Sequence, residues 1–205
     1  MRETPEQLKA LIDRAYKDIN SAAILAEQDP KRPMYHFRSP SQWMDDPNGG
    51  LWHNGYYHMF YCWNPNSYAQ RAGMVYKTAE RVWDPDSEDW TGGIGVWGHA
   101  RSKDLIHWEH LPIAIFPQIE KGEHFIWFGC VRVNKRGLPM AFYTAVGPDR
   151  RPEDTADQWV ALGDKDLINW QPYENNPVLT YSLNGDTRLG GDDFDECVMN
   201  YLVSE

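Results

Sequence analysis

The stretch SKDLIHWE at residues 102–109 recurs 62 residues later as DKDLINWQ at residues 164–171, with five of eight positions identical. Each copy follows a strand-like segment with small residues and precedes an apolar segment that contains a proline. A repeat of this length fits one blade of four antiparallel strands with generous loops, and repeated blades are typical of β-propellers. The repeat therefore predicts an all-β propeller.

The segments around the repeat also have the pattern of short strands. Aromatic-rich runs at residues 50–53 and 56–63 flank Asn54-Gly55, a dipeptide that favours a tight hairpin turn. Further strand-like segments lie at 94–101, 111–116, 125–134, 138–146 and 157–163. About 170 residues follow the first 30, which is enough for roughly three blades, whereas closed propellers have at least four. We therefore expect this chain to be the N-terminal part of a longer propeller.

Residues 4–27 predict one amphipathic helix. Thr4 and Gln7 form a capping-box pattern around Pro5, and apolar side chains recur at helical spacing behind them. We expect this helix to pack against the domain that follows. The predicted parts of the chain are an N-terminal helix over residues 1–30 and an incomplete propeller domain over residues 31–205.

The composition is acidic and rich in aromatic residues. The formal net charge of −10 argues against nucleic acids and anionic membranes as partners, because both need a basic face. Ten tryptophans and eleven tyrosines in a polar chain favour aromatic-lined clefts that bind carbohydrates. The three cysteines are widely spaced, and the sequence has neither a leader-like nor a membrane-spanning apolar run. We expect free thiols, a cytoplasmic location and a small-molecule carbohydrate substrate.

Residues 43–50 read WMDDPNGG and carry two adjacent carboxylates. The proline disfavours helical backbone at Asp46, and the Asn48-Gly49-Gly50 sequence permits positive φ angles. We therefore expect Asp46 to lie on stiff, extended backbone at the mouth of a sharp turn, which suits a nucleophile. The same pattern also begins ordinary hairpins. The flanking motifs therefore have to decide whether Asp46 is a nucleophile or an ordinary turn residue.

Several motifs, taken in order, resemble those of the invertase and levanase group, glycoside hydrolase family 32. They are RPMYHF at 32–37, WMDDPNG at 43–49, YHMFY at 57–61, WGHA at 97–100 and DLIHWEHLPIA at 104–114. The resemblance implies a five-bladed propeller, of which this chain covers roughly the first three blades. It also implies retaining hydrolysis of terminal β-fructosides (sucrose, sucrose-6-phosphate or fructans) without metal or cofactor. In that family the aspartate before the proline is the nucleophile, which implies this role for Asp46.

The family's two other catalytic carboxylates fall where this chain departs from the pattern. Residues 192–199 read DDFDECVM, and their order places Asp195 at the transition-state-stabilising aspartate of an Arg-Asp-Pro motif. In the alternative alignment, Glu196 is the acid/base of a Glu-Cys motif and the stabilising aspartate is Asp192 or Asp193. We favour the first alignment, which places the acid/base beyond Glu205.

Other departures lie at positions expected to face the substrate. Asp45 replaces an asparagine, Cys62 replaces a glutamine, and Trp127-Phe128 replaces Phe-Ser in a Phe-Ser-Gly-Ser motif. For each tryptophan, a place in the core is an equal alternative to stacking on sugar. The predicted substrate-binding residues are Trp43, Asp45, Asn48, Cys62, Trp97, Trp127 and Phe128.

These altered positions leave two functions open. The first is a fructoside hydrolase, which could also act as a transferase, because both reactions pass through a covalent fructosyl intermediate. The second is a propeller that keeps the fold and binds a glycan without turning it over.

Overall fold

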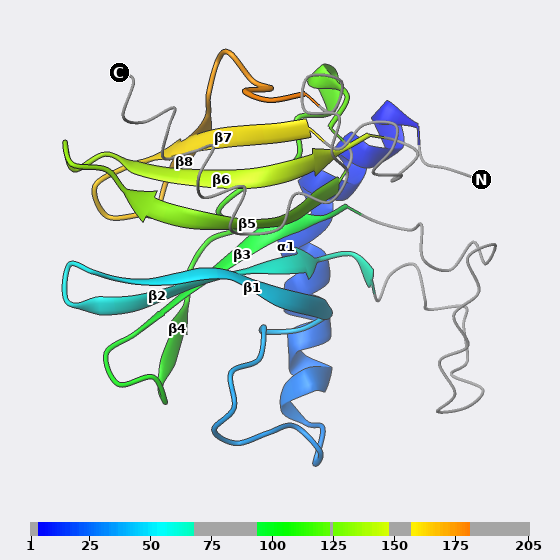
Figure 1. Cartoon of the computed structure of the whole chain (residues 1–205). Coiled ribbons are helices and arrows are strands. Elements are labelled where there is room, and N and C mark those ends of the chain that lie inside the picture. The colour runs from blue at the N-terminus through cyan, green and yellow to red at the C-terminus, as the bar shows by residue number, and fades with distance from the viewer. Residues whose placement is uncertain (1–3, 68–93, 124, 148–156, 181–205) are drawn as a thin grey trace.

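The computed structural model describes residues 4–67, 94–123, 125–147 and 157–180, and the fold is given for these residues. They form one long helix and two four-stranded antiparallel sheets that stack on each other (Figure 1). The strand orders are β1-β2-β3-β4 and β5-β6-β7-β8, so each sheet is an up-and-down meander. The elements are α1 (Pro5–Glu27), β1 (Trp43–His53), β2 (Tyr56–Asn64), β3 (Val96–Ser102), β4 (Trp108–His110), the short 3₁₀ helix η2 (Ile119–Lys121), β5 (Phe125–Val133), β6 (Pro139–Val146), β7 (Asp157–Gly163) and β8 (Trp170–Pro172).

The predicted all-β architecture after the helix is confirmed, with one strand displaced. The strands expected at 94–101, 125–134, 138–146 and 157–163 correspond to β3, β5, β6 and β7. The strand predicted at 111–116 is wrong: the outer strand is β4, and only Ile115 of that segment makes a bridge, to Trp97. Pro112 lacks the N–H group that a continuous ladder needs, so pairing is interrupted there.

The sequence repeat encodes the turn between the third and fourth strand of each sheet. Leu105 and Leu167 occupy equivalent positions, and both have positive φ angles, of 65° and 61°. In each copy the following tryptophan donates its indole N–H back to that leucine carbonyl, at 3.2 Å from Trp108 and 2.9 Å from Trp170. The repeat therefore marks two equivalent four-stranded units, as expected for propeller blades. The third predicted blade would involve residues 181–205, outside the described part of the chain.

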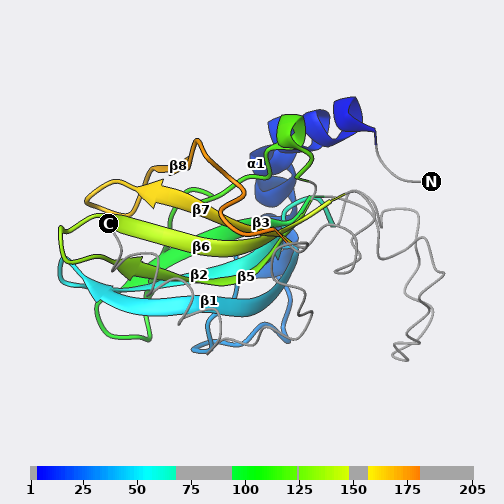
Figure 2. The ribbon, with the colours of Figure 1, turned by 45° about the horizontal axis from the view of Figure 1, so that its top comes forward.

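Strand β2 separates two apolar cores because its side chains alternate between two faces. Phe60 and Cys62 point into the core shared with the second sheet, whereas Tyr61 and Trp63 point into a core shared with α1. The helix has the predicted capping box at Thr4. It lies against the face of the first sheet that is turned away from the second sheet (Figure 2). Among the described residues, no helix is both long and apolar enough to cross a membrane.

The hairpin at Asn54-Gly55 is confirmed, but the turn expected at Asn48-Gly49-Gly50 is wrong. Asn54 and Gly55 have φ angles of 47° and 82°, and strand pairing continues directly on both sides of them. Residues 43–53 instead form one continuous strand, and Gly49, with a φ angle of 82°, lies in a bulge of β1. A single left-handed glycine bends a strand without reversing it, which is why the chain does not turn back here.

Two buried histidines face each other between β2 and β3. His58 Nδ1 lies 2.9 Å from His99 Nε2, and the His99 ring stacks on Phe60 with the ring centres 4.0 Å apart. Burial lowers the pKa of His58 to about 4 and that of His99 to about 3, and the charge of Arg101 acts in the same direction. The folded protein therefore holds both imidazoles neutral at pH 7.

The free energy of unfolding is expected to decrease as acid protonates these histidines. Both pKa values are lowered by folding, so this contribution is complete above pH 6.5 and is lost as pH falls through 6.5 toward 4 and 3. The slope is up to about 1.4 kcal/mol per pH unit for each histidine. Urea unfolding between pH 4 and 7 should show a shallower slope for His99→Gln. Exposed His36→Gln is the control, and equal slopes in all three proteins would contradict the assignment.

Candidate active site

Two bulges at equivalent places on β1 and β5 carry four of the ten predicted site residues. On β1, Met44 pairs with Trp63 and Pro47 pairs with Tyr61, so Asp45 and Asp46 both face Cys62 alone. On β5, Ile126 pairs with Ala145 and Gly129 pairs with Tyr143, so Trp127 and Phe128 both face Thr144 alone. Both pairs lie at the second and third positions after their strand begins. Bulges of this kind often redirect side chains next to active sites.

The carboxylates of the first bulge are open to solvent. Asp45 and Asp46 are both exposed, whereas Asn48, two residues further along β1, is fully buried. The site therefore offers a carboxylate to a ligand without the cost of burying its charge in the free protein.

Cys62 lies beneath the first bulge as an uncharged thiol. Its side chain is buried, and burial raises its pKa to about 12, with the negative charges of Asp45 and Asp46 contributing in the same direction. A neutral, buried thiol supplies neither a nucleophile nor the paired donors of an amide. Substrate contact by Cys62 stays a prediction, whereas its packing under β1 is observed.

Hydrogen bonds of the buried side chains of Asn48 and Trp97 connect β1 with β5. The Asn48 carboxamide, oriented to satisfy its neighbours, accepts from the Cys62 backbone N–H at 3.2 Å and from Trp97 Nε1 at 2.9 Å. Trp97 Nε1 also donates to the carbonyl oxygen of Trp127 at 2.8 Å. Both side chains are fully buried. Of the two places considered for Trp97, the structure therefore shows the one in the core. Substrate contact by Asn48 or by Trp97 stays a prediction.

The strands β1 and β5 approach closely at Gly49. A Cβ atom at this position would lie 3.3 Å from the backbone nitrogen of Val131 and 3.4 Å from Cys130 Cα. Glycine is favoured at this position for two reasons: it adopts the positive φ angle without strain, and its lack of a side chain allows the close contact between the two sheets. The WMDDPNGG motif thus contains the residues that join the sheets as well as the candidate nucleophile.

The aromatic residues of the site differ in their exposure. Phe128 is 52% exposed and Trp127 is partly buried, with the two ring centres 6.5 Å apart. Trp43 begins β1, and its backbone N–H donates to Ser67 Oγ at 2.9 Å, a contact that sequence reasoning missed because nothing local marks this serine. Asp195 and Glu196 lie outside the described residues, so their predicted roles stay predictions.

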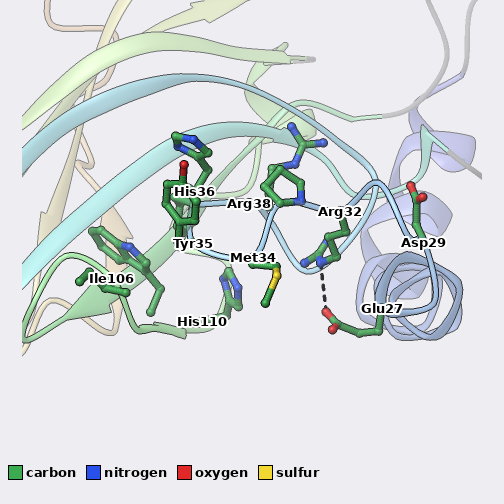
Figure 3. Close-up of a pocket in the computed structure, with 12 residues that line it drawn as sticks. Glu27, Asp29, Arg32, Met34, Tyr35, His36, Arg38, Ile106 and His110 are labelled. Carbon is green, nitrogen blue, oxygen red and sulfur yellow. Dashed lines mark ion pairs between the residues drawn. The ribbon is translucent and has the colours of Figure 1, made fainter.

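A cavity of about 400 Å³ lies away from these residues (Figure 3). It is bounded by the end of α1, the segment that follows it and the outer strand β4, and Figure 3 shows Arg32 paired with Glu27 at one side. Their atoms Nε and Oε1 are 3.2 Å apart. None of the predicted site residues lines this cavity, and part of its lining comes from β4, the edge of the first sheet opposite to β1. Within the described ranges, no cluster of three or more histidine, cysteine or acidic side chains is arranged to hold a metal ion.

Comparisons with known proteins point to one family. The profile described as "Glycosyl hydrolases family 32 N-terminal domain" matches residues 36–80 and 82–190. An acid beta-fructofuranosidase of Capsicum annuum is 33% identical over 173 residues, which cover 82% of this chain and 24% of the relative. The chain therefore spans about a quarter of the length of this curated relative.

Solved structures agree with this result. Fructan 1-exohydrolase IIa of Cichorium intybus has a TM-score of 0.55 at 32% identity, covering 74% of this chain and 24% of that one. The GH32 beta-fructofuranosidase of Bombyx mori has a TM-score of 0.58 at 28% identity, covering 90% of this chain and 33% of that one. The ordered motifs, the paired meanders and these matches together show that the chain belongs to glycoside hydrolase family 32, with its match in the family's N-terminal domain.

Proposed function

We propose that the protein containing this chain hydrolyses terminal β-fructosides by a retaining mechanism in which Asp46 is the nucleophile. The observation that carries the proposal is the exposed bulge of β1, which presents Asp46 within a motif matched by the family profile. The relatives are named beta-fructofuranosidases and fructan exohydrolases. A mutant of the Bombyx mori enzyme has been solved in complex with sucrose.

The proposed reaction needs two carboxyl groups. The Asp46 carboxylate attacks the anomeric carbon of the fructosyl unit, and the bond to the leaving oxygen breaks as a second carboxyl group gives that oxygen a proton. The resulting ester holds the fructosyl group until water, deprotonated by the second group, attacks the same carbon and releases fructose. Acceptance of a sugar hydroxyl in place of water would give transfer. The proton donor is proposed to lie beyond Glu205, with Glu196 as the alternative.

The two sheets are proposed to be the first two blades of a five-bladed propeller. Their equivalent turns, equivalent bulges and face-to-face packing support this arrangement. In it, β1 and β5 are innermost strands, so Asp46 and Phe128 would face a common axis. The cytoplasmic location stays a prediction.

A repurposed glycan-binding protein is the second candidate. It is favoured by the exposed phenyl ring of Phe128, where the family pattern given above has a serine, and by the buried thiol of Cys62, where that pattern has a glutamine. Both changes remove polar groups from predicted sugar contacts. Such a protein would bind fructosides without releasing fructose.

The full-length protein should be incubated with sucrose, inulin and levan while NMR follows the anomer of fructose released first. The proposal expects β-fructofuranose before mutarotation, because two displacements restore the starting configuration. Release of the α anomer first would refute the retaining mechanism. Saturable binding without any turnover would support the second candidate instead.

A further inference from the structure

The bulges on β1 and β5 belong to different sheets, so a shared function requires that their separation be held constant. The strand ladders cannot do this alone, because within the described part of the chain β1 pairs only with β2 and β5 only with β6. Among the described residues, two hydrogen bonds join the sheets near the bulges. The backbone N–H of Ile126, just before the second bulge, donates to the Gly95 carbonyl at 3.3 Å, whereas the indole N–H of Trp97 reaches both inner strands. It points at the Trp127 carbonyl, inside the second bulge, and at Asn48, two residues beyond Asp46.

Trp97 is well placed to act as a fixed donor. Its backbone pairs with Cys62 of β2 on one side. On the other side, its N–H donates to Ile115 at 3.0 Å and its carbonyl accepts from Ala114 at 2.8 Å. Its ring is fully buried and lies 6.3 Å from that of Phe60 and 5.8 Å from that of Tyr143. A side chain that is held at its backbone and packed against two other rings has little freedom to follow a moving acceptor.

We propose that Trp97 is a positioning residue that sets the separation of Asp46 from the aromatic pair Trp127-Phe128 through its shared indole N–H. The proposal rests on the proposed function, since it assigns both bulges to one substrate site. A displacement of about 1 Å in a catalytic group costs up to roughly a hundredfold in rate. Loss of the link should therefore affect turnover more than substrate binding.

Trp97→Phe removes the indole N–H and keeps an aromatic ring in the core. The matched control is Trp170→Phe: Trp170 is also buried and also donates its indole N–H to a carbonyl, that of Leu167, but at the outer edge of the second sheet. With the full-length protein we expect Trp97→Phe to lower kcat on sucrose by roughly tenfold to a hundredfold with KM changed less than threefold. Trp170→Phe should keep kcat within about twofold.

Backbone amide exchange gives a readout that does not depend on activity. Trp97→Phe should raise exchange at Gly49 and at Phe128 at least about tenfold relative to Trp170→Phe. If Trp97→Phe does not fold, Asn48→Ala tests the same link, with faster exchange expected at Gly49 and not at Phe128, because the bond to Trp127 remains.

The outcomes separate this inference from the function on which it rests. An unmodified protein that releases no fructose refutes the proposed hydrolase, and exchange at the two bulges still tests the link. Equal exchange in Trp97→Phe and Trp170→Phe overturns the link itself. Faster exchange with an unchanged kcat overturns the positioning role.

Discussion

Asp46→Asn is expected to lower fructose release from sucrose by at least about a thousandfold, because a carboxamide cannot form the covalent ester with the anomeric carbon. The side chain is exposed at a bulge, so the substitution should leave the free energy of unfolding within about 0.5 kcal/mol of the unmodified protein. The measurement is initial velocity over a range of sucrose concentrations in the full-length protein, with urea unfolding run in parallel.

Asp45→Asn is the matched control for that experiment. It removes the same charge from the neighbouring exposed position of the same bulge, and it installs the residue that the family pattern has there. We expect kcat/KM to stay within about tenfold, because Asp45 is not assigned to the covalent step. Equal losses in the two variants, or more than a tenth of the activity left in Asp46→Asn, would remove Asp46 from the role of nucleophile.

Gly129→Ala is expected to unfold the second sheet or to destabilise it by roughly 3 kcal/mol or more. Gly129 resumes the β5–β6 ladder after the bulge, and a Cβ atom there would lie 1.8 Å from the Phe142 carbonyl oxygen. Backbone atoms of Phe142 and Tyr143 on β6 create this clash, so no side-chain rotation relieves it. Thermal unfolding followed by circular dichroism measures the effect.

Gly50→Ala provides the comparison, because it adds the same methyl group to an inner strand at ordinary contact distance. Its Cβ atom would lie 3.6 Å from the His58 carbonyl oxygen. The change in the free energy of unfolding should be within about 0.5 kcal/mol. Equal unfolding temperatures for the two variants would contradict the close approach of β5 to β6 at Gly129.

The features that sequence reasoning predicted well are those that short stretches encode. The Asn54-Gly55 turn needs positive φ angles at two adjacent residues, and this dipeptide tolerates them locally. The repeat at 102–109 and 164–171 also acts locally, through a left-handed leucine followed by a tryptophan that bonds back to it. In such cases the physical cause and the sequence pattern lie within the same few residues.

The features that were missed depend on partners far along the chain. That Asp45 and Asp46 face one residue becomes visible only when the register with β2 is known. The same holds for Trp127 and Phe128 against β6. Trp97 reads equally well as a sugar-stacking or a core residue, and its burial follows from the stacking of the second sheet on the first. Non-local pairing, which a single sequence does not display, decides each of these cases.

The equivalent bulges have a consequence for how such a protein could diverge. Each sheet presents two side chains from the same place on its first strand, acidic in one sheet and aromatic in the other. Because the ladder resumes after each bulge, these residues can be exchanged while the paired residues on either side stay unchanged. If both sheets arose by duplication of one blade, both inherited the same two-residue bulge. Selection could then have changed the side chains of each bulge independently without altering the fold.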